Sequence, residues 1–142
     1  MNLLVTAAMP RPSPAIRAAL WAAQIVLAGM FALAGFMKAT LPPVELVKQM
    51  PYAADLPLAL MRFIGASELA GALGVILPAA TRIRPGLTPL AAAALLTVMI
   101  LASAFHLSRG ETYALPINAG LGLLAAFVAW GRYKAAPIAA RG

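Results

Sequence analysis

Four long apolar stretches constrain this chain more than any other feature. They cover residues 16–37, 58–77, 87–107 and 115–130. A helix needs about 20 apolar residues to cross a hydrocarbon core ~30 Å thick, and the stretches reach or nearly reach that length. A soluble chain of 142 residues with 63% hydrophobic residues could not bury so much apolar surface. The pattern therefore predicts an all-α membrane protein, a four-transmembrane-helix antiparallel bundle.

The charged residues divide between the two ends of the predicted bundle. Seven of the eleven basic residues fall on one side of the spans: Arg11, Arg17, Arg82, Arg84, Arg132, Lys134 and Arg141. The other four basic residues and all four acids fall on the opposite side. Because cytoplasmic loops carry an excess of Lys and Arg, both termini are predicted to be cytoplasmic. We attribute the net charge of +7 to basic residues that set the orientation of the protein and attract anionic lipid. Nucleic acid is not an expected partner.

The chain divides into a membrane domain with a tail on either side. Residues 1–15 contain three prolines and are expected to form a disordered cytoplasmic tail. Residues 16–134 form the predicted transmembrane domain, and residues 135–142 a second cytoplasmic tail. Ala32-Leu33-Ala34 resembles a signal-peptide cleavage site, but the apolar run continues past it, so we expect an uncleaved span.

The longest connection, residues 38–57, lies on the predicted outer side and contains four prolines. Within it Val44, Val47 and Met50 recur at intervals of three. This spacing is compatible with a short amphipathic helix on the membrane surface. An irregular surface loop explains the same residues equally well.

Five polar residues stand out near or within the spans, all toward the predicted outer side: Lys38, Arg62, Glu68, His106 and Asn118. An ionisable residue within a span costs about 2.5–3.5 kcal/mol on insertion scales, so such residues face protein or water. Their clustering predicts an outward-facing polar pocket, and we take all five as candidate ligand-binding residues. Glu68 and His106 are the candidates for catalysis because they can carry protons.

Each of these residues also has a purely structural interpretation. Glu68 shares a helix face with Gly65 and Gly71, and small residues mark contacts between membrane helices. Glu68 is therefore expected to point into the bundle, where it either fixes packing through an ion pair or hydrogen bond, or handles protons or ligand. Lys38 can snorkel to the surface, and Arg62 can pair with Asp55 or a lipid phosphate.

The chain has a single histidine and no cysteine. A multi-histidine or thiolate metal site is therefore excluded, and neither a metal nor an intrinsic cofactor is expected. The lack of cysteine also excludes thiol redox catalysis by this chain itself.

Several segments, in this order, carry a resemblance to a known family: residues 34–38, 62–71, 77–83, 87–91 and 127–132, with His106, Arg109-Gly110-Glu111 and Asn118 between the last two. Together they resemble the DoxX-like family of small four-helix bacterial membrane proteins. The resemblance implies a multi-pass protein of the bacterial inner (plasma) membrane. It also implies that Lys38, Glu68, His106 and Asn118 match positions that recur in the family.

The resemblance implies function only loosely. Some members are subunits of a thiosulfate:quinone oxidoreductase, and others are linked to membrane redox or oxidative-stress complexes. We accordingly expect a subunit or accessory of a quinone-linked redox complex, so that any enzymatic role is that of an oxidoreductase subunit. A quinone is the expected ligand, other redox subunits the expected partners, and a homo-oligomer is compatible with the sequence.

Two other functions remain open from the sequence. One is a non-catalytic membrane scaffold or assembly factor, in which the polar residues only fix helix packing. The other is a carrier for a small solute, which the absence of an inverted repeat makes the weakest of the three.

Overall fold

The computed structural model describes residues 10–142, which form helices and connecting turns without any strand in that range. Four helices are long: α1 (Pro14–Thr40), α3 (Leu58–Thr81), α4 (Leu87–Ser108) and α5 (Leu115–Trp130). The short elements are α2 (Pro43–Gln49), two 3-10 turns (Pro51–Asp55 and Thr112–Ala114) and a π turn (Gly131–Ala135). Most of the tail expected at residues 1–15 lies outside the described residues, and α1 already begins at Pro14.

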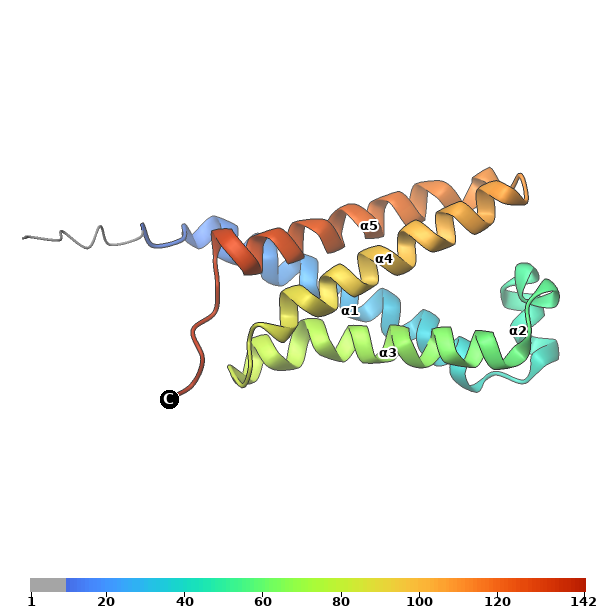
Figure 1. The fold of residues 1–142 in the computed structure, drawn as a ribbon, viewed down its shortest axis with the longest axis horizontal. Coiled ribbons are helices and arrows are strands. Elements are labelled where there is room, and N and C mark those ends of the chain that lie inside the picture. The colour runs from blue at the N-terminus through green and yellow to red at the C-terminus, as the bar shows by residue number, and fades with distance from the viewer. Residues whose placement is uncertain (1–9) are drawn as a thin grey trace, which may run out of the picture.

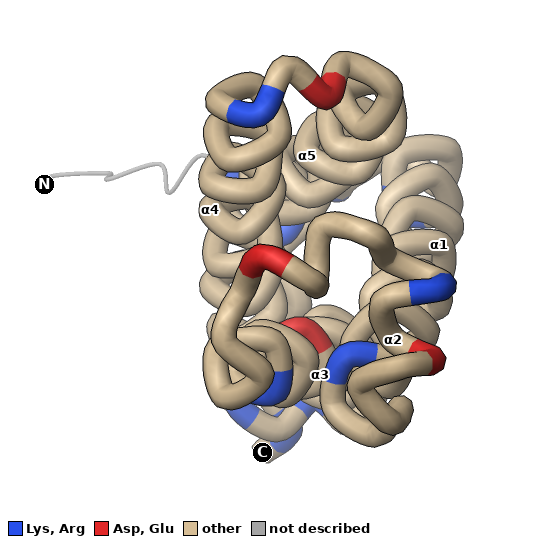
Figure 2. Tube along the Cα trace, turned by 90° about the vertical axis from the view of Figure 1, so that its right-hand side faces the viewer, with Lys and Arg blue, Asp and Glu red and all other residues tan. Residues whose placement is uncertain are grey.

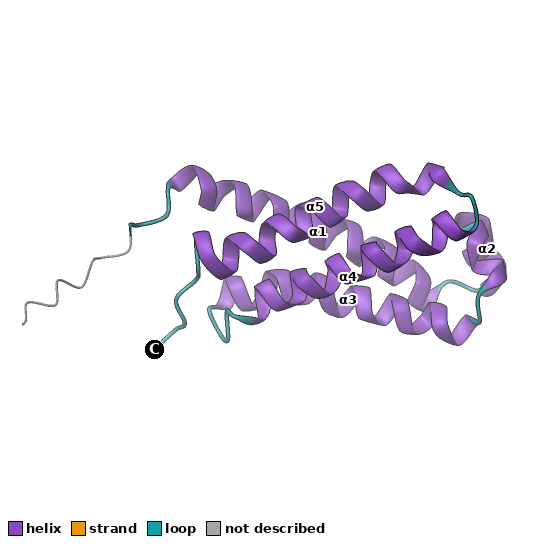
Figure 3. Cartoon of the chain, turned by 45° about the horizontal axis from the view of Figure 1, so that its top comes forward, coloured by secondary structure: helices purple, strands orange, loops and turns teal. Residues whose placement is uncertain are grey.

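The four long helices form a closed antiparallel bundle (Figure 1). Each packs against two others, in the order α1, α3, α4, α5 and back to α1. Short connections join α3 to α4 and α4 to α5 (Figure 3). All four helical segments are long and apolar enough to cross a membrane. The predicted fold is confirmed, and the chain is a multi-pass membrane protein.

The surface of the bundle is apolar around its middle, as contact with lipid requires. Large side chains such as Phe63 and Leu123 are 69% and 72% exposed. The centre is packed by a continuous cluster that includes Leu27, Val75 and Leu95. In a soluble bundle these exposed apolar side chains would be in contact with water. The distribution therefore fits a bundle whose outer surface is in contact with lipid.

Helix α3 continues beyond the apolar span expected from the sequence. The expected span ends at Leu77, before Pro78, whereas the helix runs through Pro78 to Thr81. A proline lacks the N–H that would bond to the carbonyl four residues earlier, but in the last turn this removes a single bond. The Thr81 hydroxyl donates to the Leu77 carbonyl at 2.7 Å, which supplies one of the helix-terminal carbonyls with a donor.

The loop from Leu41 to Pro57 contains the short helix that the sequence left open. Helix α2 packs through Leu46, which is 1% exposed, against Ala53 and Met61. Val44, the first residue of the expected apolar face, is instead exposed. The other two residues of that face, Val47 and Met50, pack beside Leu46 against the same cluster. The loop therefore packs onto the end of the bundle, and its contact with the membrane surface stays a prediction.

The two ends of the bundle differ in charge. The end formed by α2 and the two 3-10 turns carries Glu45, Asp55 and Glu111, and Glu68 lies deeper in the half of α3 nearer to it; this end is called the acidic end (Figure 2). The opposite end, where α1 begins and where the C-terminus lies, is called the basic end; it carries Arg11, Arg17, Arg82, Arg84, Arg132, Lys134 and Arg141. This separation matches the sequence pattern, whereas which end faces the cytoplasm stays a prediction.

Helices α1 and α3 cross at unusually short range through Gly35 and Gly65. A β-carbon on Gly35 would lie 2.8 Å from the Gly65 carbonyl oxygen. A β-carbon on Gly65 would lie 2.7 Å from the Gly35 carbonyl oxygen and from the Ala39 nitrogen. All three neighbours are backbone atoms, so only glycine allows the helices to approach this closely.

This contact predicts a position-specific effect of alanine. Gly65→Ala should lower the free energy of unfolding by about 1–3 kcal/mol, the range for overpacked sites, because the two helix backbones must separate. Gly29→Ala on α1 is the matched control, since a β-carbon there meets no atom within 4 Å. Thermal unfolding in detergent measures both variants. Equal melting temperatures for the two would contradict a rigid glycine crossing.

Candidate functional site

Four of the five polar residues singled out in the sequence line one cavity near the acidic end. The cavity has a volume of about 410 Å³, within the size range of small-molecule sites. Lys38 reaches it from α1, Glu68 from α3, His106 from α4 and Asn118 from α5. Each of the four long helices thus contributes one polar residue, which places these groups together although they are far apart in the chain.

Lys38 and Glu68 form a buried ion pair. The Lys38 ammonium donates to both carboxylate oxygens of Glu68, at 2.9 and 2.7 Å, and the two residues are 7% and 2% exposed. Each lies three residues after a glycine of the α1–α3 crossing, Gly35 or Gly65, on the same face of its helix. The close crossing therefore brings the two side chains within range and lets them neutralise each other within the bundle.

Arg62 has a different role from the one expected. Its guanidinium donates to the carbonyls of Lys38 and Leu41, at 2.7 and 2.6 Å. These carbonyls belong to the last turn and the C-cap of α1, where no helical donor remains for them. Arg62 does not line the cavity. The structure therefore places it as a cap on α1, and it supports the site only by holding the Lys38 backbone.

His106 is held by a chain of charged groups at the acidic end. Its Nδ1 lies 2.7 Å from Glu111 Oε2, and Arg109 donates to Glu111 Oε1 at 2.8 Å and to Asp55 at 2.7 Å. Hydrogen bonds from His106 and then from Arg109 hold the pKa of Glu111 below its usual value of 4.5. Because an ionised carboxylate only accepts, Nδ1 carries the proton, and Nε2 is left for another partner.

The same chain closes the end of the bundle. Asp55 terminates the 3-10 turn Pro51–Asp55, whereas Arg109 follows α4. Hydrogen bonds to Glu111 and then Asp55 raise the pKa of Arg109, so it stays charged and joins the two segments. His106 is thereby fixed from outside the cavity that it lines.

Tyr52 is a further polar group in the cavity that sequence reasoning did not find. Its ring makes edge-on contacts with Phe105 and His106, with centroids 6.1 and 5.1 Å apart. Burial raises the pKa of Tyr52 to about 12, and the negative charge of Glu68 adds to the effect. The phenol therefore keeps its proton, and its hydroxyl donates to the Met50 sulfur, a weak acceptor, at 3.4 Å. A single tyrosine among loop prolines gave no pattern that distinguishes it.

Asn118 lines the cavity and holds a buried donor without a partner within residues 10–142. The residue is 8% exposed, and its Nδ2 has no hydrogen-bond partner among residues 10–142. A buried polar group without a partner costs about 1–3 kcal/mol. The amide sits one turn into α5, where the residue lines both this cavity and a groove between α4 and α5.

The remaining wall of the cavity is apolar and reaches the lipid-facing surface. Leu60 and Phe63 of α3 and Leu101 of α4 line it, and all three are exposed side chains. Figure 1 shows that α3 and α4 diverge from their tight turn toward the acidic end. The cavity thus combines an apolar opening between two helices with polar groups at its inner end.

A second buried polar cluster, toward the basic end, was also missed. Gln24 of α1 accepts from Arg132 Nε at 2.6 Å and donates to the Val75 carbonyl. Gln24 is polar but not ionisable, so a selection based on ionisable residues leaves it out. An amide within an apolar stretch nevertheless indicates a hydrogen bond between helices. Among residues 10–142, no three His, Asp or Glu side chains come together as metal ligands.

The ion pair predicts strong coupling between Lys38 and Glu68. Lys38→Met or Glu68→Leu alone should cost about 3–5 kcal/mol, because each leaves an uncompensated buried charge. The double substitution should recover most of that loss, since an apolar pair needs no counter-charge. Unfolding titrations of the four proteins form a double-mutant cycle. Additive losses would contradict the pairing.

The charged chain at the acidic end predicts an acid-labile contribution to stability. The depressed pKa of Glu111 stabilises the fold above pH 4.5, and this contribution is lost as the pH falls through the lower folded-state value. The melting temperature of the wild type should therefore drop more steeply than that of Glu111→Gln below pH 4.5. Parallel curves for the two proteins would show that the His106 and Arg109 contacts contribute nothing.

Comparison with known proteins identifies the family. A sequence profile described as the DoxX-like family matches residues 22–128. Comparison with curated proteins and with solved structures gives no significant match. The profile extends from within α1 to within α5 and includes Lys38, Tyr52, Glu68, His106 and Asn118 of the cavity. On this match over most of its length, the protein belongs to the DoxX-like family.

Proposed function

We propose that the protein binds a lipophilic molecule with a carbonyl-bearing head group in the cavity between α3 and α4, and that it serves a quinone-linked redox complex as a membrane subunit or accessory. The observation that carries the proposal is the buried Asn118 amide, whose Nδ2 finds no partner in residues 10–142. A ligand carbonyl would supply the missing acceptor.

The other polar groups suit the same head group. Tyr52 keeps a phenolic proton, and His106 has Nε2 free of the contact with Glu111. These groups and the Asn118 amide approach the cavity from different elements, so they are placed to contact different atoms of one ring. A quinone accepts electrons together with protons at its two carbonyl oxygens. Within this chain Tyr52 and Asn118 would orient the ring, and His106 would exchange protons with it.

The apolar side of the cavity supports entry from the membrane. Leu60, Phe63 and Leu101 line the opening and are exposed where lipid surrounds the bundle. An isoprenoid tail could stay between α3 and α4 while the ring reaches the polar end. Burial of such a tail contributes about 0.8 kcal/mol for each CH₂ group.

The redox centre itself would belong to a partner protein. This chain has no cysteine, so it cannot carry thiol chemistry of its own. The resemblance of the sequence to families with quinone-reducing members supports such an arrangement. We place the chain in a bacterial inner membrane with the basic end cytoplasmic, which puts the cavity near the outer face.

A scaffold function has one observation in its favour. Lys38 and Glu68 satisfy each other in the apo bundle, so their burial needs no ligand. Asn118 separates the two functions, because a pure scaffold gains nothing from an unpaired buried donor.

The test is Asn118→Leu, which keeps the size of the side chain and removes the donor. The apparent dissociation constant of a short-chain ubiquinone analogue should rise roughly three- to tenfold, the equivalent of one hydrogen bond. The melting temperature should stay the same or increase, because an unpaired buried group disappears. Binding is measured by titration of the protein in nanodiscs.

Gln49→Leu is the matched control, since it removes an exposed amide from α2 outside the cavity. It should bind the analogue like the wild type. Unchanged binding by Asn118→Leu, together with wild-type activity of a co-purified complex, would refute the ligand site and favour the scaffold.

A further inference from the structure

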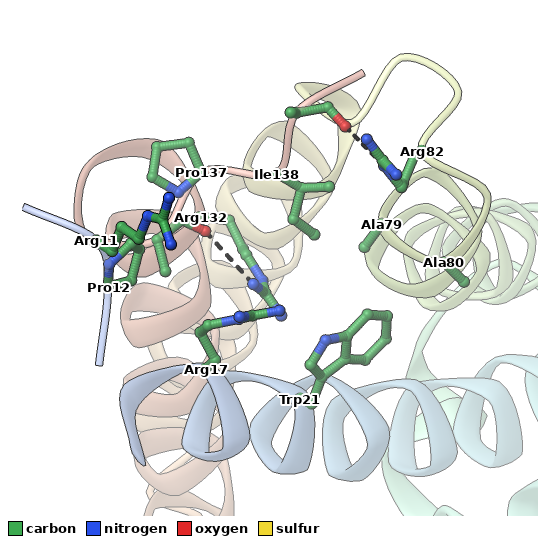
Figure 4. A pocket seen from close by; sticks show the side chains of 12 residues that line it. Arg11, Pro12, Arg17, Trp21, Ala79, Ala80, Arg82, Arg132, Pro137 and Ile138 are labelled. Carbon is green, nitrogen blue, oxygen red and sulfur yellow. Dashed lines mark hydrogen bonds between the residues drawn. The ribbon is translucent and has the colours of Figure 1, made fainter. Parts of the chain in front are cut away.

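A second cavity lies at the basic end, on the other side of the bundle from the candidate functional site. It has a volume of about 520 Å³ and is formed where α1, the end of α3 and the chain after α5 meet. Four arginines line it: Arg11, Arg17, Arg82 and Arg132. Figure 4 shows these side chains around a common space.

Arg132 is the innermost of the four and is only 5% exposed. Its Nε donates to Gln24, and its Nη1 makes a long contact of 3.4 Å with the Ala136 carbonyl. Its Nη2 has no hydrogen-bond partner within residues 10–142. Since a buried charged group is normally paired or fully hydrogen-bonded, this nitrogen lacks the acceptor it needs.

The packing around Arg132 holds the guanidinium in one orientation. The bond from Nε to the Gln24 amide fixes one edge, and the Trp21 ring lies 5.2 Å from its central carbon. Gln24 is itself held by the Val75 carbonyl of α3. The free Nη2 is therefore a positioned donor, with its geometry set by three helices before any ligand arrives.

The cavity has no carboxylate to balance these charges. Three of the four side-chain carboxylates in the sequence lie in the loops of the acidic end, and the fourth, Glu68, is paired with Lys38 inside the bundle. Arg17 instead extends toward Arg132 in Figure 4, so two guanidinium groups face the same space. Like charges that converge in a partly enclosed site repel each other unless an anion lies between them.

The chain after α5 closes the cavity on one side. Arg82 Nε donates to the Ala139 carbonyl at 3.0 Å, and the Arg141 N–H donates to the Arg82 carbonyl at 2.9 Å. These bonds hold residues 137–139, which line the cavity, against the end of α3. The basic residues are thus arranged around an enclosed space and are not merely spread over a surface.

We propose that this cavity binds a phosphate group, either of an anionic lipid headgroup or of a free phosphate, between Arg17 and Arg132. Guanidinium groups present planar pairs of N–H donors that match phosphate oxygens, and such contacts are among the stronger hydrogen bonds in proteins. The proposal is independent of the ligand and of the redox role assigned to the acidic end.

The position of the cavity suits a lipid headgroup. It lies at the end of the apolar spans, where Trp21 and Tyr133 place aromatic rings at the level typical of the membrane interface. Basic pockets between transmembrane helices are known sites for anionic headgroups. A bound phosphate would bridge α1 to the chain after α5 and so stabilise the bundle.

The experiment compares the wild type with Arg17→Gln in a maltoside detergent. Arg17 is exposed and makes no ion pair with any other residue of the range 10–142, so we expect its replacement to leave the fold intact. Melting temperature is recorded against short-chain phosphatidylglycerol, against diacylglycerol of the same chain length, and against inorganic phosphate at constant ionic strength. Arg84→Gln is the matched control, because Arg84 is an exposed arginine at the same end that does not line the cavity.

We expect the wild type and Arg84→Gln to be stabilised at phosphatidylglycerol concentrations at which diacylglycerol has no effect. Arg17→Gln should need roughly tenfold more lipid, as expected for loss of one charge-assisted hydrogen bond. Stabilisation by inorganic phosphate with the same dependence on Arg17 would assign the site to free phosphate. Equal responses of Arg17→Gln and Arg84→Gln to every ligand would overturn the proposal, because the effect would then be general electrostatic attraction.

Discussion

The close crossing of α1 and α3 is the constraint on which the rest of the structure depends. Gly35 and Gly65 bring two helix backbones into contact that no other residue permits. At the same crossing Lys38 lies against Gly65 and Glu68 against Gly35. The two side chains meet there, so that two charges that would be costly in lipid become a neutral pair. Arg62 then caps the end of α1 from α3. The close packing of α1 against α3 and the neutralisation of the two buried charges thus occur at the same place.

The two ends of the bundle use charge in opposite ways. At the acidic end nearly every charge has a partner, and the chain from Asp55 through Arg109 and Glu111 to His106 holds the loops over the cavity. At the basic end the arginines converge without a side-chain carboxylate. The charges at the acidic end pair with one another, whereas the arginines at the basic end lack carboxylate partners within residues 10–142. This arrangement fits a bundle with a binding site near one end and contacts with anionic groups at the other.

The sequence alone determined the number of membrane spans, their antiparallel order and the separation of charge between the ends. Apolar runs of membrane length leave the chain no other way to satisfy its backbone, so these features follow from local composition. The sequence also identified Lys38, Glu68, His106 and Asn118, because a polar residue in an apolar run is conspicuous. The profile of the DoxX-like family covers the same stretch.

Only the tertiary structure decided what those residues do. It pairs Lys38 with Glu68, removes Arg62 from the cavity, and leaves Asn118 Nδ2 without a partner within residues 10–142. It adds Tyr52 from a loop and joins Gln24 to Arg132 across more than a hundred residues of sequence. The physical reason is that helix rotation and crossing distance are set by contacts between distant residues, here two glycines. Composition places a polar side chain in a span, but only packing decides which neighbour it meets.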